Sequence, residues 1–470
     1  MADLHAVVIG GSMAGLCTAR VLADAFDRVT IVERDALPTD ATERAGVPQA
    51  RHVHALLERG RRELEALFPG FDGRLRAAGA HFLDFGLEFA VLREIGWQPR
   101  KPSPYHAWFA SRSLIESAAR AGLAAHPAIR LVERQSVAGL VGDGNGHARV
   151  RGVRLQARDG GATSEIPADL VVDASGRASR AADWLRALGL VPPAETVVNS
   201  FTGYATRWYR MPPRDRWPRH WWWKGIGIDP VEPEFMTAGL LVPVEGDRWI
   251  VTIAGISKHY PPVEESAWMD AVRGLRSPLI AEALALAEPL SPIHASREME
   301  NRFRHYERWT ERLDGFVALG DAACKFNPVY GQCMTSAAVS ARLLGDVIRA
   351  TGPKSPDLPR RFFRAQARFL AEPWSMAVGA DFRFRATEGP RPPLTSLTNS
   401  YMDALFTLSF EDDGVRDTLV DVIHMMRPAS ALFGPAIAAR AGLRLVGRLA
   451  GRTARPAPTA FPPGVGAAAA

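Results

Sequence analysis

The sequence predicts an α/β protein with a Rossmann-like nucleotide-binding domain, an inserted domain built on an antiparallel sheet, and a C-terminal helical region. The first observation is an apolar run at residues 5–9, followed by Gly10, Ser12 and Gly15 and then by a helical pattern. The second observation is another apolar run, which ends in Glu33. Strand, glycine turn, helix and strand in this order are typical of a dinucleotide-binding βαβ unit.

The residue types in this turn have a physical reason. Glycine allows the chain to turn sharply and to approach a ligand closely, and the start of the following helix offers free N–H groups to a pyrophosphate. An acid after the second strand can accept hydrogen bonds from ribose hydroxyls. Ser12 replaces the middle glycine of the usual pattern. A plain strand–helix turn is the alternative for the glycines alone, and Glu33 makes it the weaker interpretation.

Composition limits the class of protein. With 470 residues, of which 47% are hydrophobic and 23% charged, the chain is long enough for two or three soluble domains. The net charge is +6, but only five of the 57 basic residues are lysines and no dense basic block occurs. We therefore expect no nucleic-acid partner.

Cysteine content and hydropathy indicate the compartment. The three cysteines, Cys17, Cys324 and Cys333, are too few for a disulfide framework, and their spacing fits no zinc site. The first strand begins almost at Met1, which leaves no room for a signal peptide, and no apolar run is long enough to span a membrane. We therefore expect a reducing, cytoplasmic location and no metal site.

Segment 44–54 and a helix follow the βαβ unit. His52 and His54 suggest a metal pair, but no further ligand is near them in the sequence, so packing histidines are the favoured interpretation. Strand-like alternation occupies residues 80–100. Arg112 then stands where a strand ends and a helix begins, and the pattern leaves a ligand contact and a surface arginine equally open.

Residues 195–300 are rich in aromatic side chains. They hold seven of the 12 tryptophans, and a hairpin is predicted around residues 245–247. This pattern indicates an antiparallel sheet. The tryptophans form either the core of that sheet or the wall of a pocket for an apolar ligand, and both interpretations stay open. The candidates for the wall are Trp221, Trp223 and Trp249.

A second strand, acid, loop and helix stretch begins at residue 315. Its apolar run ends at Asp321, a loop with Pro328 and Gly331 follows, and an Ala-rich helix runs to about residue 349. The end of the strand and the start of the helix would point at one ligand. A carboxylate there holds hydroxyl groups, and helix N–H groups stabilise negative charge.

The C-terminal region is predicted to be helical from a proline-rich break at 352–359 to about residue 452. A basic amphipathic helix on a membrane surface is one interpretation of its end, and a packed helix with a solvated arginine face is the favoured one. The arginines that recur there every fourth residue are Arg440, Arg444, Arg448 and Arg452. The Pro/Ala/Gly-rich end, residues 453–470, is predicted to be disordered.

Together these stretches make the chain similar to flavoprotein monooxygenases of the aromatic-hydroxylase and squalene-epoxidase type. The likeness covers roughly residues 5–350, is closest to the bacterial epoxidases of polyether antibiotic pathways, and is most specific at 44–54, 320–322 and 327–332. We accordingly expect an FAD-binding domain at 1–80, 105–190 and 300–350, a substrate-binding sheet domain at 81–104 and 191–299, and a helical region at 351–452.

The resemblance also implies which residues hold FAD. The glycine turn would bind the pyrophosphate, Glu33 the adenosine ribose and Asp321 the ribityl chain. Arg112 would lie beside the cofactor, and the Pro/Gly loop would lie against the isoalloxazine. The full set expected at FAD is Gly10, Ser12, Met13, Ala14, Gly15, Glu33, Arg34, Arg44, Gln49, Arg112, Val137, Asp321, Pro328, Gly331, Gln332, Cys333 and Met334.

Two departures from the family pattern bear on function. Many single-component hydroxylases carry an Asp-Gly pair after the middle strand, which is linked to FAD and NAD(P)H use. Here Ser175 and Gly176 stand in that place, which favours a separate flavin reductase or electron donor. Cys333 stands where a second glycine is common, and we expect it close to the flavin.

The resemblance implies that the flavin carries the chemistry. Reduced FAD would add O2 to give a C4a-hydroperoxide, which transfers one oxygen atom to the substrate by epoxidation or hydroxylation. No Ser-His-Asp set, no carboxylate pair and no base for phenol ionisation stands out in the sequence. A Trp-rich sheet without a charge clamp favours a large apolar substrate, such as a polyketide or an isoprenoid.

Other functions remain open. One alternative is an FAD-dependent reductase or dehydrogenase of an isoprenoid-like substrate, and another is a non-catalytic flavin-binding or scaffold protein. A flavin halogenase is disfavoured, because the sequence holds no Trp-x-Trp-x-Ile-Pro signature.

Overall fold

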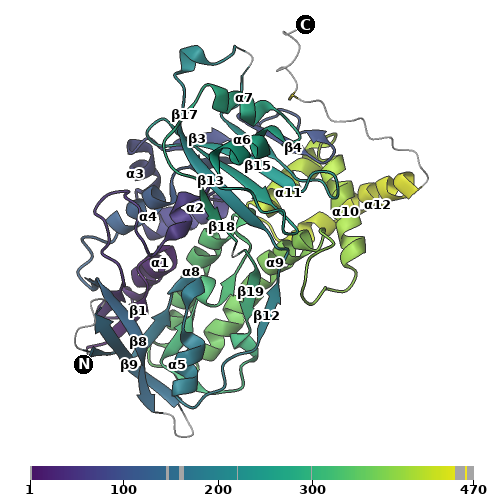
Figure 1. Cartoon of the computed structure of the whole chain (residues 1–470). Helices are drawn as coiled ribbons and strands as arrows, with labels where there is room; N and C mark the ends of the chain where they lie inside the picture. Colours follow the sequence, from purple (N-terminus) through teal and green to yellow (C-terminus); the bar gives the residue numbers. More distant parts are fainter. Residues whose placement is uncertain are drawn as a thin grey trace.

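A computed structural model of the chain shows a five-stranded parallel sheet in the first domain. Its strand β1 is labelled near the N-terminus in Figure 1. The structure describes residues 3–143, 148–157, 163–219, 221–297, 299–449 and 461–462. The sheet has the strand order β21–β11–β1–β2–β7, and all neighbours are parallel. The bounds are β1 His5–Ile9, β2 Arg28–Val32, β7 Ile129–Val132, β11 Leu170–Asp173 and β21 Phe316–Ala318.

The predicted βαβ unit forms because its strands are apolar and its helix packs on them. β1 is buried at every position, and α1 (Met13–Leu22) packs beside α8 (Cys333–Thr351). The strands of the parallel sheet end at one edge, where Gly10, Glu33 and the turn at Asp321 follow them. Ligands of open α/β sheets bind at this edge.

Smaller elements surround the parallel sheet. A second sheet of β8, β9, β10 and β20 contacts it through β9 and β8, and a third sheet has the order β12–β19–β22. Their bounds are β8 Gln135–Asp143, β9 Ala148–Ala157, β10 Thr163–Pro167, β12 Glu195–Val198, β19 Asn301–Arg304, β20 Leu313–Asp314 and β22 Cys324–Lys325. The helices of this part are α2 Glu58–Leu67, α3 Phe71–Ala77, α4 Arg112–Ala121 and α5 Ala181–Ala187.

The large sheet draws its strands from two separate parts of the chain. Its order is β17–β13–β16–β15–β14–β4–β5, with β18 paired to β13. The hairpin predicted around residues 245–247 joins β15 to β16, and positive φ values at Gly246 and Asp247 allow the reversal. The bounds are β4 Phe89–Arg93, β5 Gly96–Trp97, β13 Gly203–Arg210, β14 Gly225–Ile228, β15 Thr237–Val244, β16 Arg248–Gly255, β17 Glu288–Pro289 and β18 His294–Ser296.

The two faces of this sheet have different neighbours. Side chains alternate along a strand, so Trp249 of β16 lies on one face and Ile250 on the other. The face of Trp249 packs on α6 (Glu265–Arg273) and α7 (Leu279–Ala285). The face of Ile250 packs on β3 (His81–Asp84), β6 (His106–Phe109) and segment 44–54.

Four helices follow the first domain, as predicted: α9 Leu358–Asp381, α10 Thr395–Leu408, α11 Asp413–Ile423 and α12 Pro435–Leu449. In α12, Arg440 pairs with Asp412, and Arg444 lies 2.7 Å from Glu411. These two arginines therefore belong to a packed helix with paired charges. The side chains of Arg448 and Arg452 lie outside the described residues, as does the predicted tail apart from residues 461–462.

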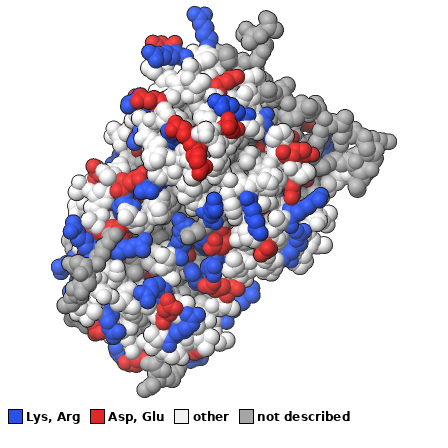
Figure 2. Space-filling model, in the orientation of Figure 1, with Lys and Arg blue, Asp and Glu red and all other residues white. Residues whose placement is uncertain are grey.

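Surface charge and helix hydropathy are two further features of the described part of the chain. On the face shown in Figure 2, basic and acidic side chains are interspersed over the surface. No helix in the described ranges combines the length and the apolar character that a membrane-spanning segment needs.

Candidate functional site

The turn between β1 and α1 is too tight for side chains at two positions. Gly10 has a φ of +103°, and a Cβ there would lie 2.7 Å from the carbonyl oxygen of Ala174. A Cβ on Gly15 would lie 1.8 Å from the carbonyl oxygen of Gly10. Gly15 thus lets α1 begin directly beside the turn, at the ligand-binding edge of the sheet.

The start of α1 is suited to an anion. Ser12 is the N-cap residue, but its side chain makes no capping bond and instead donates a hydrogen bond to Glu116 Oε2, 2.6 Å away. The N–H groups of Met13 and Ala14 have no partner within the helix, because the first turn of any α-helix lacks one. These groups and the helix dipole match the needs of a pyrophosphate.

Glu33 lies where a ribose ligand is predicted, and it also fastens the turn. Its buried carboxylate accepts hydrogen bonds from the N–H of Gly11 at 2.7 Å and from the N–H of Asp35 at 3.0 Å. Arg44 Nη1 lies 3.1 Å from Glu33 Oε1. The carboxylate therefore joins the glycine turn to segment 44–54, and its contact with a ribose stays a prediction.

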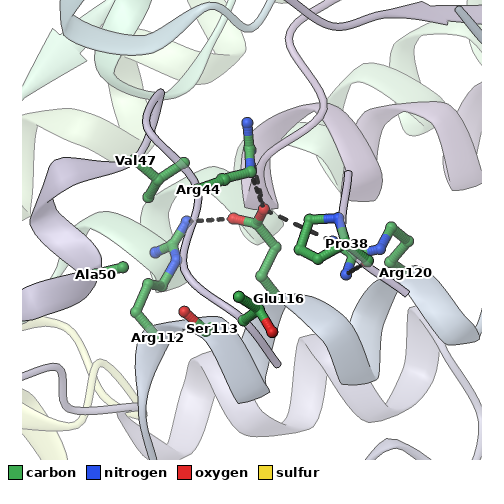
Figure 3. A pocket seen from close by; sticks show the side chains of 9 residues that line it. Pro38, Arg44, Val47, Ala50, Arg112, Ser113, Glu116 and Arg120 are labelled. Carbon is green, nitrogen blue, oxygen red and sulfur yellow. Dashed lines mark hydrogen bonds and ion pairs between the residues drawn. The ribbon is translucent and has the colours of Figure 1, made fainter. Parts of the chain in front are cut away.

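A second buried carboxylate, that of Glu116 in α4, contacts two of the arginines predicted at the cofactor, Arg44 and Arg112. Arg44 donates hydrogen bonds to Glu116 Oε1 at 3.1 Å and 2.9 Å, and Arg112 Nη2 lies 3.5 Å from Oε2. Figure 3 shows Arg44, Arg112 and Arg120 directed toward Glu116 in the lining of a pocket. Burial acts to raise the pKa of Glu116, but the charges of Arg112 and Arg44 outweigh it and lower that pKa below its ordinary value.

Glu116 is not among the residues predicted for the site, although the sequence holds a signal for it. Glu116 follows Arg112 by four residues, the spacing that places two side chains on one face of a helix. Arg112 itself is 7% exposed, which excludes the surface-arginine interpretation.

Two buried polar atoms at this edge have no hydrogen-bond partner among the described residues: Arg112 Nε and Gln332 Oε1. Gln332 precedes α8, which also begins without a side-chain cap. Buried polar groups are costly when unpaired. A bound ligand with phosphates and hydroxyl groups would pair them, so the residues present fit FAD in charge and in hydrogen bonding.

The second predicted stretch, from residue 315 onward, lies beside the start of α1 through the turn that holds Asp321. Asp321 lies in a turn after β21, and a Cβ on the preceding Gly320 would lie 2.9 Å from the Cβ of Ala14 in α1. Within the described ranges, no residue donates a hydrogen bond to the Asp321 carboxyl. Burial raises the pKa of Asp321, and the charge of Arg177 opposes that shift. The carboxyl is thus available to a hydroxyl group of a ligand.

The loop between Asp321 and α8 has a defined conformation. Pro328–Tyr330 form a 3-10 turn, and the Asn327 side chain accepts a hydrogen bond from the N–H of Val329 at 3.3 Å. Gly331 ends the turn with a φ of +66°. Cys333 opens α8, and burial raises the pKa of its thiol, which therefore stays protonated.

The other predicted cofactor residues lie near this edge or in the core beside it. Arg34 Nη2 donates a hydrogen bond to the carbonyl of Gly46 at 3.1 Å, and Gln49 is half-buried in a 3-10 turn. Three more are buried, in α1, α8 and β8: Met13, Met334 and Val137. Their contacts with a cofactor stay predictions.

His52 and His54 are packing residues in this structure. His52 Nδ1 lies 2.9 Å from Thr206 Oγ1 on the inner face of the large sheet, and His54 Nδ1 lies 3.0 Å from the carbonyl oxygen of His52. Burial lowers the pKa of each histidine to about 3, so both are neutral at physiological pH. Across the described ranges, no group of three or more His, Cys, Asp or Glu side chains could hold a metal ion.

The tryptophans predicted as a possible substrate wall are buried in this structure. Trp221, Trp223 and Trp249 are 6%, 0% and 0% exposed and pack among themselves and against α6 and α7. They lie on the face of the sheet that points away from segment 44–54. Period-two alternation along the strands, which the sequence shows, does not say which face meets the first domain. In this structure these tryptophans belong to the sheet core, and a contact with a substrate stays a prediction.

Comparison with known proteins agrees with this geometry. Residues 3–351 match the family described as FAD binding domain. The chain is 32% identical over 468 residues to the protein Rv3254 of Mycobacterium tuberculosis, which covers 92% of this chain and 93% of that protein.

Solved structures share the fold at low identity. The flavin-dependent brominase Bmp2 superposes with a TM-score of 0.64 at 15% identity and covers 96% of this chain and 100% of its own. The p-nitrophenol 4-monooxygenase PnpA from Pseudomonas putida DLL-E4 superposes with a TM-score of 0.61 at 16% identity, over 90% of this chain and 98% of its own. The chain therefore belongs to the family of proteins with this FAD-binding domain, and FAD is its cofactor.

Proposed function

We propose that this flavoprotein is a monooxygenase that inserts one oxygen atom from O2 into a large apolar natural-product intermediate, such as a polyketide or an isoprenoid. The observation that carries the proposal is the family match over residues 3–351 together with a cofactor cradle formed by Gly10, Gly15, Arg112 and Asp321. FAD, when bound and reduced, supplies the reaction with O2. Epoxidation and hydroxylation are both candidate reactions, and the resemblance to the epoxidases of polyether antibiotic pathways supports epoxidation.

The residues of this chain would contribute binding, orientation and exclusion of water. The glycine turn and the start of α1 would hold the pyrophosphate, and the guanidinium groups of Arg44 and Arg112 would balance its charge. Asp321 would accept hydrogen bonds from the ribityl hydroxyls. Since His52 and His54 are neutral, they add no charge to the space between the first domain and the large sheet.

With the tryptophans in the sheet core, the substrate is proposed to bind on the opposite face. On the face of the large sheet that carries Ile250, three partly buried apolar side chains pack against the buried cluster: Val53, Phe85 and Leu240. Apolar walls with few polar groups suit a large apolar substrate. The sheet domain at 81–104 and 191–299 would then supply the substrate pocket, and the FAD-binding domain would close it.

The reducing equivalents are proposed to come from a separate flavin reductase or electron donor in the cytoplasm. Ser175 replaces the aspartate of the Asp-Gly pair, and its hydroxyl donates a hydrogen bond to the buried Asp173 at 2.5 Å. This side chain therefore supports the turn after β11. Contact with a membrane is not favoured, because Arg440 and Arg444 pair with acidic side chains.

The test is turnover by the FAD-loaded protein with a flavin reductase and isotopically labelled O2. We expect an apolar alkene-containing polyketide or isoprenoid to gain one labelled oxygen atom, with oxygen consumption coupled to product. Turnover without oxygen would instead support the alternative, an FAD-dependent reductase or dehydrogenase of an isoprenoid-like substrate. Halide-dependent product would indicate a halogenase, and absence of bound FAD would indicate a non-catalytic protein.

A further inference from the structure

One buried carboxylate of the C-terminal helical region, Asp381, accepts hydrogen bonds from several side chains, Ser200 among them. It is the last residue of α9 and is 1% exposed. Tyr330 Oη donates to its Oδ1 at 2.6 Å, and Asn327 Nδ2 donates to the same oxygen at 3.1 Å. Asn301 Nδ2 donates to its Oδ2 at 2.6 Å. Burial raises the pKa of Asp381, and the hydrogen bonds to its carboxyl group, first that from Tyr330, oppose this shift.

Two of these donors lie at the two ends of the 3-10 turn that precedes α8. Asn327 is the residue before the turn Pro328–Tyr330, and Tyr330 is its last residue. A single carboxylate oxygen therefore holds both ends of the turn. Gly331, with a φ of +66°, and then α8 follow directly.

The backbone N–H group and both side-chain polar atoms of Asn327 are hydrogen-bonded. Its N–H donates to Asn301 Oδ1 at 2.7 Å, its Oδ1 accepts from the N–H of Val329 at 3.3 Å, and its Nδ2 donates to Asp381. Asn301 and Asn327 are 0% and 1% exposed. Water therefore cannot replace a lost partner, and removal of the carboxylate would leave buried donors unpaired.

Unfavourable backbone conformations accompany the network. Ser200 Oγ lies 3.5 Å from Asn327 Nδ2, and its neighbour Phe201 has a φ of +51°. Ser257 and Lys258, whose N–H groups bond to the carbonyls of Ser200 and Phe201, have φ values of +55° and +72°. Non-glycine residues adopt such values only where surrounding contacts hold them, and they concentrate at functional sites.

We propose that Asp381 is a positioning residue of the flavin site, which fixes the loop 327–331 and thereby the start of α8 against the cofactor. The inference rests on the proposed place of this loop beside the isoalloxazine. Asp381 lies beyond residues 3–351, the part matched by the FAD-binding family. The helical region is thus a component of the cofactor site, and its α9 acts on the flavin through Asn327 and Tyr330.

The test compares Asp381→Asn with a matched control elsewhere in the helical region. The amide of Asn has the size of the carboxylate but presents an N–H2 group to donors, so at least one bond to Asn301, Asn327 or Tyr330 is lost. The control is Asp421→Asn, since Asp421 also accepts a tyrosine hydroxyl, Tyr105 Oη at 2.7 Å. Fluorescence titration gives the Kd for FAD, and visible spectra with redox titration report the flavin's surroundings.

We expect Asp381→Asn to raise the Kd for FAD about tenfold or more, and to shift both the absorption bands and the midpoint potential of bound FAD. Asp421→Asn lowers thermal stability but leaves all three flavin readouts unchanged. If Asp381→Asn does not fold, Tyr330→Phe removes one hydroxyl only, with Tyr105→Phe as its control. Folded Asp381→Asn or Tyr330→Phe protein with unchanged flavin affinity, spectrum and potential would overturn the inference.

These readouts need no turnover. Suppose that Asp381→Asn changes the Kd, the absorption bands and the midpoint potential of FAD, but the wild-type protein oxygenates no substrate. This result would refute the proposed function alone. Coupled oxygenation by the wild type with an unshifted flavin in Asp381→Asn would refute the positioning role alone.

Discussion

Because of the tight glycine turn, we expect the substitution Gly15→Ala to weaken the binding of FAD strongly. The new Cβ would lie 1.8 Å from the carbonyl oxygen of Gly10, whereas real Cβ contacts are essentially never under 3.0 Å, so the two must separate by about 1.2 Å. Both atoms belong to the backbone or are fixed directly to it, and no side chain can move to relieve the clash. The separation displaces the first N–H groups of α1 from the pyrophosphate.

The size of the effect follows from the hydrogen bonds that would be lost. A displacement of this size takes a bond of ordinary length out of range. A hydrogen bond to a charged group contributes about 1.5–3 kcal/mol, so the loss of two N–H contacts costs about 3–6 kcal/mol. We therefore expect the Kd for FAD to rise by about a hundredfold to ten-thousandfold.

The assay is titration of the apoprotein with FAD, followed by flavin fluorescence, with circular dichroism as the check of folding. Gly379→Ala is the matched control, because Gly379 lies inside α9 and no atom lies within 4 Å of the place that its new Cβ would take. It should stabilise the protein by up to about 1 kcal/mol and leave the Kd unchanged. Folded Gly15→Ala protein that binds FAD as tightly as the wild type would refute the reasoning.

Four further predictions follow from the site and the fold. Arg112→Lys keeps the charge but loses the planar fork of donors, so equilibrium titration should show a Kd for FAD about tenfold higher; an unchanged Kd would place the phosphates elsewhere. Burial lowers the pKa of His52 from 6.5 to about 3. The unfolded chain therefore binds a proton that the folded chain does not between those pH values, and the free energy of unfolding falls on acidification through this window. For one such group the slope is about 1.4 kcal/mol per pH unit; urea unfolding of His52→Gln should show a shallower pH dependence, and equal slopes would contradict the buried neutral state. Trp223→Ala should lower the free energy of unfolding by about 3–5 kcal/mol without changing the KM for the substrate, and a raised KM with intact stability would return this residue to the pocket. Arg444→Ala breaks an exposed pair with Glu411 and should cost less than about 1 kcal/mol; sedimentation with anionic vesicles should find neither protein bound, and binding by the wild type that the variant loses would revive the membrane interpretation.

Local patterns predicted the parts of the fold that depend on short stretches of chain. The strand, glycine turn and helix at residues 5–22 and the hairpin between β15 and β16 are confirmed. The pattern that predicts each of them lies within one short stretch of chain, although β1 also pairs with the distant β11. The FAD-binding fold and the cofactor are confirmed by the family match, and individual cofactor contacts stay predictions.

Local sequence patterns specify the nucleotide-binding unit, because glycines, an apolar run and a terminal acid act on their immediate neighbours. Tertiary packing decides two other features: Trp223, which precedes β14, packs on the face of the large sheet covered by α6 and α7, and Glu116 meets Arg44 across 72 residues of chain. It alone joined Asp381 to Asn327, 54 positions away. Such contacts depend on how distant elements dock, and side-chain type and spacing along the chain hold no direct record of that docking.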